Sequence, residues 1–392
     1  MQSSQGFSIA PFLLLLSREH LSGNEKARLV DLAPRSIDEW CDLRDAARRL
    51  HVLPFVFHHV VGLNLLTDDQ ISELGLKQLA IQSTALWLRV LAAQTNFQEK
   101  CLEPLNIKHV FLKGLTLSDF YSNPSLRTPR DIDVLINSED FEAVLSLAKR
   151  HGYKVMLDPK RGVLAETKNE EKFASFFKPD LALVSPEGIL IELHYGISRD
   201  FSGLRNDEIF SSGHVMSVEK KQFMTMNPTL HLLYLCSHHS HHLWDSLKWL
   251  ADISAFQNYY HDNLEAITEL AKKYGMDDVV EVSFAFEALT RLDTLDESVD
   301  PRALSLLKVS IERINNSSSL SEGARRAMNS FPFFLQSSPS FLSAVTRRAR
   351  RSFQLDVADY HKLKLPYALR SLYFIPSIYR FFSRQFSKVL SK

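Results

Sequence analysis

The sequence predicts an α+β fold in which a small mixed β-sheet core is flanked by N-terminal and C-terminal helical regions. Residues 1–103 carry the apolar spacing of helices, and residues 104–226 change to short β-rich runs separated by turns. Helical spacing returns over residues 227–314, and residues 315–392 are interpreted as a linker followed by a basic, aromatic helical tail. A chain of 392 residues is long enough for two or three such units.

The N-terminal region begins with an apolar run, Phe7–Leu16, which contains Pro11 and has no basic residue before it. It is too short to span a bilayer, so we expect a helix that packs into the core. A second helix is expected after Ser36, because Ser36 and Glu39 form a capping-box pattern ahead of helically spaced apolar residues. Residues 74–102 predict a further long helix.

The central region mixes strand and helix signals. The runs "IKHVFLKG" and "DIDVLI" predict short strands, and "EDFEAVLSLAKRHGYKV" predicts a helix that ends at Gly152. A hairpin is expected around Pro186-Glu187-Gly188, with a strand on each side. The region is therefore expected to form the small sheet of the fold.

The composition is that of an ordinary globular protein, with 45% hydrophobic and 23% charged residues. Lys plus Arg and Asp plus Glu are equal at 46 each, so no overall charge favours nucleic acid. Cys41, Cys101 and Cys236 lie far apart without a CxxC spacing. They predict reduced thiols in a cytoplasmic protein, not a disulfide framework.

The C-terminal tail departs from this balance. From Arg347 on it is rich in Lys, Arg, Phe and Tyr, and its only acids are Asp356 and Asp359. One interpretation is a helix that packs its aromatic face on the body of the protein. A second is peripheral contact with an anionic membrane, at the inner face. Nucleic acid is a third and less favoured partner.

Two strand runs carry acids on one face. In a strand, residues i and i+2 point the same way, so Asp131 and Asp133 share a face. In "ILIELHY", Glu192 and His194 share a face in the same way. If these strands are neighbours, Asp131, Asp133 and Glu192 form a cluster whose mutual repulsion a divalent cation relieves. Mg²⁺ or Mn²⁺ is the expected ion, because both prefer oxygen ligands and bind phosphates.

Other interpretations of these acids remain open. An Asp-x-Asp sequence lies most often in a turn or at the exposed edge of a sheet. Arg127 and Arg130 lie just before the acids, and Arg130 can simply pair with Asp131 or Asp133.

Five features in order resemble a known family. They are "EWCDLRDAARRLHVLP", the "LKG" turn, "RTPRDIDVLI", the Glu192-Leu193-His194 strand and "HHLWDSLKWLADI". Together they resemble the DNA-polymerase-β-like nucleotidyltransferase superfamily, and most of all a bacterial branch known only as nucleotidyltransferase family proteins. The resemblance covers roughly residues 10–300.

The resemblance implies roles for individual residues. Asp131 and Asp133 would bind the metal ions, and Glu192 would be the third carboxylate, as a bridging ligand or as the base on the acceptor hydroxyl. The turn at Gly114 would face the triphosphate, although Lys113-Gly114-Leu115 stands where the superfamily usually has Gly-Ser or Gly-Gly. The residues expected to contact the nucleotide are Lys113, Gly114, Arg127, Arg130 and His194.

The predicted function is Mg²⁺-dependent transfer of a nucleoside monophosphate from ATP, or another NTP, to an acceptor, with release of pyrophosphate. The acceptor is expected to be a small molecule, a glycan precursor or a protein. One alternative is kinase-like phosphoryl transfer on the same fold. Another is a degenerate nucleotidyltransferase that serves as a binding module.

A histidine cluster follows in the next helical region. His238, His241 and His242 have the i, i+3, i+4 spacing that can bind zinc, but polar residues that line the substrate cleft, or packed or surface residues of the helix, are the favoured interpretations. Trp244 and Trp249 are expected in the core, and Lys248 with Asp252 is expected to form an exposed pair.

Overall fold

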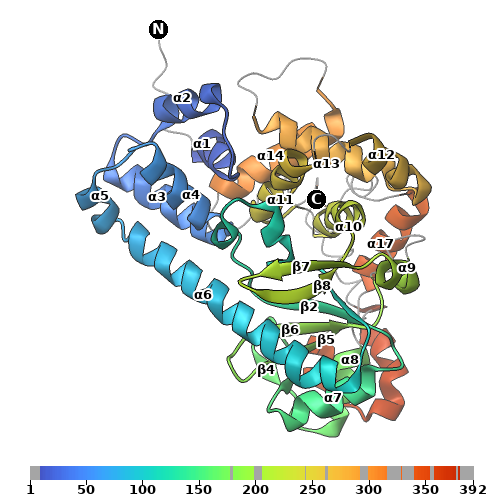
Figure 1. Cartoon of the computed structure of the whole chain (residues 1–392). Coiled ribbons are helices and arrows are strands. Elements are labelled where there is room, and N and C mark those ends of the chain that lie inside the picture. Colours follow the sequence, from blue (N-terminus) through green and yellow to red (C-terminus); the bar gives the residue numbers. More distant parts are fainter. Residues whose placement is uncertain are drawn as a thin grey trace.

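The chain folds into one mixed β-sheet surrounded by helices, as the computed structural model shows (Figure 1). The predicted α+β class is therefore confirmed. The structure describes residues 9–176, 180–197, 205–242, 244–260, 264–291, 299–315, 328, 340–353, 357–376 and 378–379.

The described part of the N-terminal region, from Ile9 on, consists of helices joined by short loops. Its helices are α1 (Ile9–Leu16), α2 (Gly23–Leu32), α3 (Ile37–Arg49), α4 (Leu53–Gly62), α5 (Asp68–Glu73) and α6 (Leu76–Phe97), which continues into a π-helical turn at Gln98–Leu102 and a 3-10 turn at Glu103–Leu105. The capping box at Ser36 and Glu39 is present, and Phe12 of α1 is wholly buried. The apolar run at the N-terminus is thus a core helix.

The sheet has the strand order β4-β3-β5-β6-β2-β1-β8-β7. Its strands are β1 (His109–Phe111), β2 (Asp131–Ile136), β3 (Lys154–Asp158), β4 (Val163–Leu164), β5 (Asp180–Val184), β6 (Leu190–His194), β7 (His214–Val218) and β8 (Lys221–Thr225). The predicted hairpin around Pro186-Glu187-Gly188 joins β5 to β6, which run antiparallel. The sheet is mixed, because β2 pairs with β6 in parallel and with β1 in antiparallel orientation.

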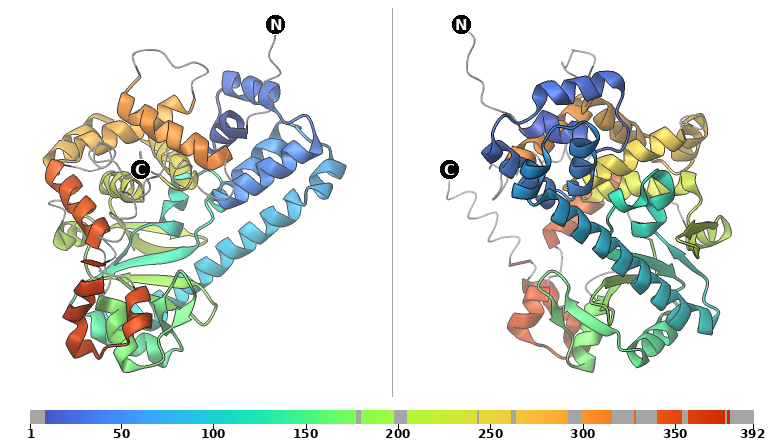
Figure 2. Two further views of the ribbon diagram at one scale, coloured as in Figure 1. Left: turned by 180° about the vertical axis from the view of Figure 1, so that it is seen from behind. Right: turned by 60° about the vertical axis from the view of Figure 1, so that its left-hand side comes forward.

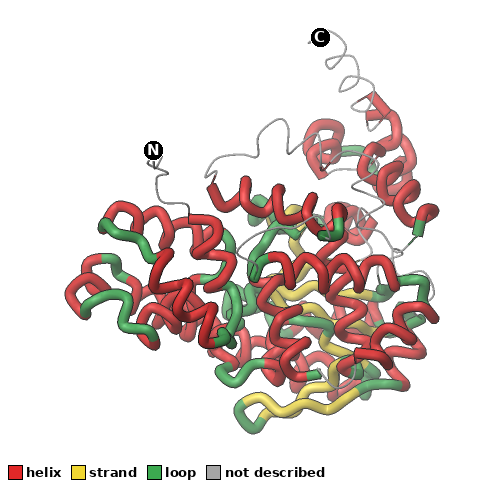
Figure 3. The backbone as a smooth tube through the Cα atoms, turned by 90° about the horizontal axis from the view of Figure 1, so that it is seen from above, coloured by secondary structure: helices red, strands yellow, loops and turns green. Residues whose placement is uncertain are grey.

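Helices cover both faces of the sheet (Figures 1 and 3). On one face, α6, α7 (Phe141–Arg150) and α8 (Lys168–Phe176) share a core with Ile132, Val134 and Ile136 of β2. The other face carries α10 (Pro228–His241), α11 (Lys248–Tyr259), α12 (Leu264–Lys273), α13 (Asp277–Leu289) and α14 (Pro301–Asn315), whose core includes Leu135. A further short helix, α9 (Asn206–Ser211), precedes β7. The alternation along β2 therefore turns its acids toward the α10–α14 side.

The described part of the tail forms α17 (Phe341–Phe353), α18 (Val357–Leu363) and a 3-10 helix at Tyr367–Tyr373. Tyr360 and Tyr373 are buried, with ring centroids 4.7 Å and 5.2 Å from that of Phe173 in α8. The C-terminal helices, red in Figure 2, lie beside the green segment that contains α8. These aromatic residues thus pack on the body of the protein, as one interpretation predicted. The predicted linker at 315–340 lies almost wholly outside the described residues. Within the described ranges, no helix combines the length and apolarity needed to cross a membrane.

Candidate metal and nucleotide site

The parallel pairing of β2 with β6 brings the two acidic strand faces together. Asp133 lies directly opposite Glu192, and Asp131 lies opposite Leu190. The strands are neighbours, which was the condition for a shared cluster. Residues 59 positions apart in sequence thus meet across one step of a ladder, where side chains on the same face are about 5 Å apart.

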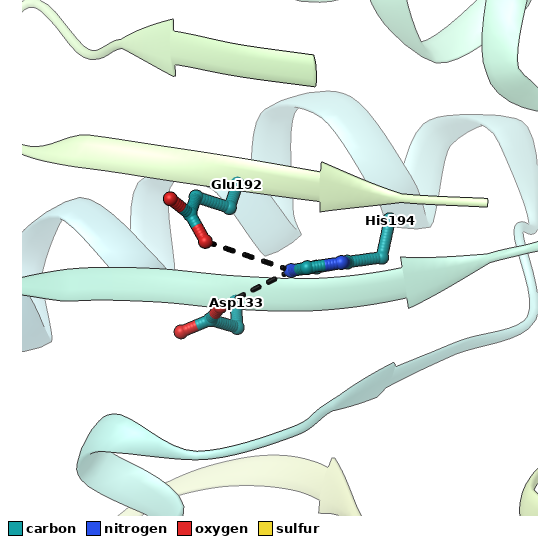
Figure 4. A group of neighbouring side chains, drawn as sticks. All are labelled: Asp133, Glu192 and His194. Atoms are coloured by element: carbon teal, nitrogen blue, oxygen red, sulfur yellow. Dashed lines mark hydrogen bonds and ion pairs between the residues drawn. The ribbon is translucent and has the colours of Figure 1, made fainter. Parts of the chain in front are cut away.

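Asp133, Glu192 and His194 offer ligand atoms that all lie within 4.8 Å of one another. The His194 Nε2 atom is 3.1 Å from Asp133 Oδ1 and 3.8 Å from Glu192 Oε2 (Figure 4). Asp131 lies outside this group, at the start of the same strand. The structure therefore places His194, which was predicted to contact the nucleotide, among the metal-ligand candidates.

Lys113 supplies the positive charge that balances this cluster. The Leu112 N–H donates to the Asp133 carbonyl at 3.0 Å, which extends the β1–β2 ladder to the residue before Lys113. The Lys113 Nζ atom lies 3.0 Å from Asp133 Oδ1 and 3.0 Å from His238 Nε2. Lys113 thus contacts the carboxylate at the centre of the candidate metal site.

The two oxygens of the Asp133 carboxylate differ in their contacts. Its side chain is 0% exposed, and Oδ1 already contacts both Lys113 and His194. Oδ2 is buried without a hydrogen-bond partner among the described residues. Because an unpaired buried oxygen is costly, this atom fits an ion as its missing partner. Two carboxylates and an imidazole are a donor set that Mn²⁺ accepts, and the carboxylates alone suit Mg²⁺.

Burial and neighbouring charges shift the pKa values of the two carboxylates in opposite directions. Burial raises the pKa of Asp133, but the charge of Lys113 and the His194 hydrogen bond outweigh burial and hold that pKa well below its usual value. Burial and then the charge of Asp133 raise the pKa of Glu192 to about 7. Asp133 is therefore firmly ionised, whereas Glu192 ionises near neutral pH.

Gly114 begins the turn that leaves β1. Its φ of +78° lies in the left-handed region, and a Cβ atom there would be 3.2 Å from the Asp131 backbone oxygen. Both features require glycine. The 3-10 segment that follows, Gly114–Phe120, packs close to the start of β2. The glycine thus lets the turn approach the strand that carries the two aspartates.

Arg127 forms a buried ion pair with Asp252 of α11. Its Nε and Nη2 atoms donate to Asp252 of α11 at 2.8 Å and 3.0 Å. The Tyr121 hydroxyl donates to the same carboxylate at 2.8 Å. Burial alone would lower the pKa of Arg127, but the negative charge and the hydrogen bonds of Asp252 outweigh burial and raise that pKa. The predicted exposed pair between Lys248 and Asp252 is therefore wrong, because Asp252 is buried against Arg127.

Arg130 is exposed and contacts His51 instead of an acid. Its Nη1 atom lies 2.9 Å from His51 Nε2. In the described part of the chain, it forms no ion pair with Asp131 or Asp133, which was one alternative for its role. Arg130 therefore remains free to contact a ligand.

Histidines at the end of α10 lie against one another and against Trp249, and one of them, His238, contacts Lys113. The rings of His238 and His242 lie 4.5 Å apart, and His239 stacks on Trp249. Trp244 and Trp249 are buried, as predicted. The His241 side chain lies outside the described residues, so the zinc alternative stays a prediction.

A cavity of about 420 Å³ opens beside Asp131. Two of its basic residues, His51 and Lys248, were not predicted to belong to a site, and Lys248 was expected to pair with Asp252 instead. The cavity is lined by His51, Arg130, Asp131, Leu190, Asp245, Ser246, Lys248 and Trp249.

Comparison with known proteins identifies the family. A search of the curated proteins finds no match to the chain. A family model described as "uncharacterised nucleotidyltransferase" matches residues 36–289, which include the whole sheet and helices α3 to α13. The chain belongs to this family of uncharacterised nucleotidyltransferases.

Proposed function

We propose that the protein is a Mg²⁺- or Mn²⁺-dependent nucleotidyltransferase of the DNA-polymerase-β-like type. The observation that carries the proposal is the parallel register that sets Asp133 opposite Glu192, where the buried Oδ2 of Asp133 has no hydrogen-bond partner among the described residues. Asp133, Glu192 and His194 would hold the ion, with Asp131 as a further ligand at the start of β2. When bound, the ion neutralises phosphate charge and orients the triphosphate.

The protein's own residues have distinct tasks in the proposed transfer of a nucleoside monophosphate from ATP or another NTP. An acceptor oxygen forms a bond to the α-phosphorus, the bond from the α-phosphorus to the bridging oxygen breaks, and pyrophosphate leaves. Glu192 would take the acceptor's proton, because its side chain is 22% exposed whereas that of Asp133 is 0% exposed. Lys113 keeps Asp133 ionised, and the Gly114 turn would face the phosphates.

Transfer of label separates the proposal from its alternatives. Purified protein with Mg²⁺ and ATP labelled on the α-phosphate is expected to label an acceptor in cell extract, whether small molecule, glycan precursor or protein. Label from the γ-phosphate alone would support the kinase-like alternative. Absence of transfer from any of the four NTPs would support the binding-module alternative and contradict our proposal.

We also propose that the protein is cytoplasmic and that α17 touches an anionic membrane. Phe341 and Leu342 are 66% and 73% exposed, and Arg348 of the same helix is exposed as well. The wild type is expected to co-sediment with vesicles containing phosphatidylglycerol and not with pure phosphatidylcholine, and F341S/L342S is expected to lose this binding. Equal sedimentation of wild type and variant would contradict membrane contact through this helix.

A further inference from the structure

The cavity beside Asp131 is built from segments that are distant in the chain. His51 follows the end of α3, Arg130 and Asp131 begin β2, and Lys248 begins α11. Ser246 fixes the loop before α11 by donating to the Leu50 carbonyl at 3.1 Å. The volume of about 420 Å³ lies within the range of small-molecule sites.

Lys248 lines the cavity, and within the described residues nothing forms a hydrogen bond or ion pair with its ammonium group. Asp252, one helical turn further along α11, is taken by Arg127 and Tyr121. Burial and then the positive charge of Arg127 lower the pKa of Lys248 to about 8. Such a group is costly in the free protein, so an anionic ligand would stabilise it.

Arg130 adds a second cation to the same cavity. Because Arg can only donate, His51 Nε2 accepts the hydrogen bond from Arg130 at 2.9 Å. Burial, followed by the charges of Lys248 and Arg130, lowers the pKa of His51 to about 4. His51 is therefore neutral and orients the guanidinium without neutralising it.

Two acids share the cavity with these cations. Asp131 is a proposed metal ligand, whose charge the ion would balance, and Asp245 is exposed to solvent. Leu190 and Trp249 form an apolar wall. Two separated cations next to a proposed metal site are the arrangement that a phosphate group requires, since its oxygens accept from several directions at once.

We propose that Lys248 and Arg130 bind a phosphate group of the substrate in this cavity, next to Asp131. This inference rests on the proposed function and adds to it a residue, Lys248, that recognises the ligand's charge. The phosphate belongs either to the triphosphate of the NTP or to a phosphorylated acceptor.

Calorimetric titration with Mg²⁺-tripolyphosphate tests the proposal. K248M is expected to weaken binding at least about tenfold, the usual loss for one charge-assisted hydrogen bond, whereas K248R retains most of the affinity. K77M, which removes an exposed lysine of α6, is the matched control and is expected to bind like the wild type. The thermal midpoint of K248M is expected to stay equal or rise, because a partly buried charge with no ion pair among the described residues has been removed.

Wild type and K248M that bind both tripolyphosphate and inorganic phosphate with equal affinity, or wild type that binds neither, would overturn the proposal. Tripolyphosphate has no nucleoside to transfer, so the result is independent of the labelling assay. If no label is transferred but the protein still binds phosphate in a way that depends on Lys248, the proposed function is contradicted and this inference stands.

A second titration distinguishes the two sources of the phosphate. If the triphosphate occupies the cavity, a non-hydrolysable NTP analogue displaces tripolyphosphate, and K248M weakens the analogue by a similar factor. If the acceptor occupies it, protein saturated with the analogue still binds inorganic phosphate. K248M then abolishes phosphate binding and leaves the affinity for the analogue unchanged.

Discussion

Asp133→Asn is expected to lower the rate of nucleotidyl transfer by at least about 10³-fold, the scale of losing a charged group that stabilises the transition state. The Asp133 carboxylate contacts Lys113 and His194 and lies opposite Glu192, so it is the centre of the candidate site. An amide keeps the shape but removes the negative charge and one acceptor oxygen. Initial rates with α-labelled NTP and the acceptor found by labelling measure the effect.

The control for this variant must separate chemistry from folding. Asp133→Asn leaves the ammonium of Lys113 without its anion, so some stability is also lost. Glu192→Gln is the second test, because Glu192 is partly exposed and its loss is expected to slow transfer with little effect on the thermal midpoint. Glu139→Gln, an exposed acid just after β2, is expected to change neither. Rates of Asp133→Asn and Glu192→Gln within threefold of the wild type would exclude the proposed carboxylate pair.

Arg127→Met is expected to lower the free energy of unfolding by about 3–5 kcal/mol, because it leaves the buried carboxylate of Asp252 without its counter-charge. The pair is bidentate, both side chains are nearly inaccessible, and the Tyr121 hydroxyl joins it. It links the segment before β2 to α11, so its loss also loosens the wall that carries Lys248. Urea unfolding measures the change.

A double-mutant cycle isolates the pair. Arg127→Met combined with Asp252→Leu is expected to recover much of the stability, because no unpaired charge remains. The matched control is Arg205→Met, which breaks the ion pair with Asp207, where the two side chains are 75% and 76% exposed. This variant is expected to change the free energy of unfolding by less than about 1 kcal/mol. A cost below 1 kcal/mol for Arg127→Met would show that the pair is not a structural link, and Arg127 would return as a candidate phosphate ligand.

Local signals in the sequence predicted those parts of the fold that local chemistry determines. The Ser36–Glu39 capping box and the turn at Gly188 each specify one element within a few residues. The β7–β8 hairpin was missed because its turn uses Glu219 and Lys220, both with positive φ, in place of the expected Gly or Asn. The pairing of β8 with β1 joins distant segments and has no local signature.

The site shows the same difference between local signals, which the sequence carries, and contacts between distant segments, which it does not. Period-two alternation placed Asp131 with Asp133 and Glu192 with His194, and the structure brings Asp133, Glu192 and His194 together. The partner of Arg127 could not be predicted, because Asp252 lies 125 residues away on a helix whose packing is set by the whole core. The place of Lys248 in the cavity was missed because the sequence offers Asp252, one helical turn away, as its partner. In the structure, Asp252 pairs with Arg127 instead.

Coupled binding of metal and nucleotide tests the central claim, that the cluster of Asp133, Glu192 and His194 holds the ion that carries the triphosphate. The measurement is an EPR titration of Mn²⁺ with wild type and Asp133→Asn, each with and without a non-hydrolysable NTP analogue. We expect the wild type to bind Mn²⁺, the analogue to tighten that binding, and Asp133→Asn to lose both effects. Wild-type protein that binds Mn²⁺ no better than Asp133→Asn, with or without the analogue, would contradict the account.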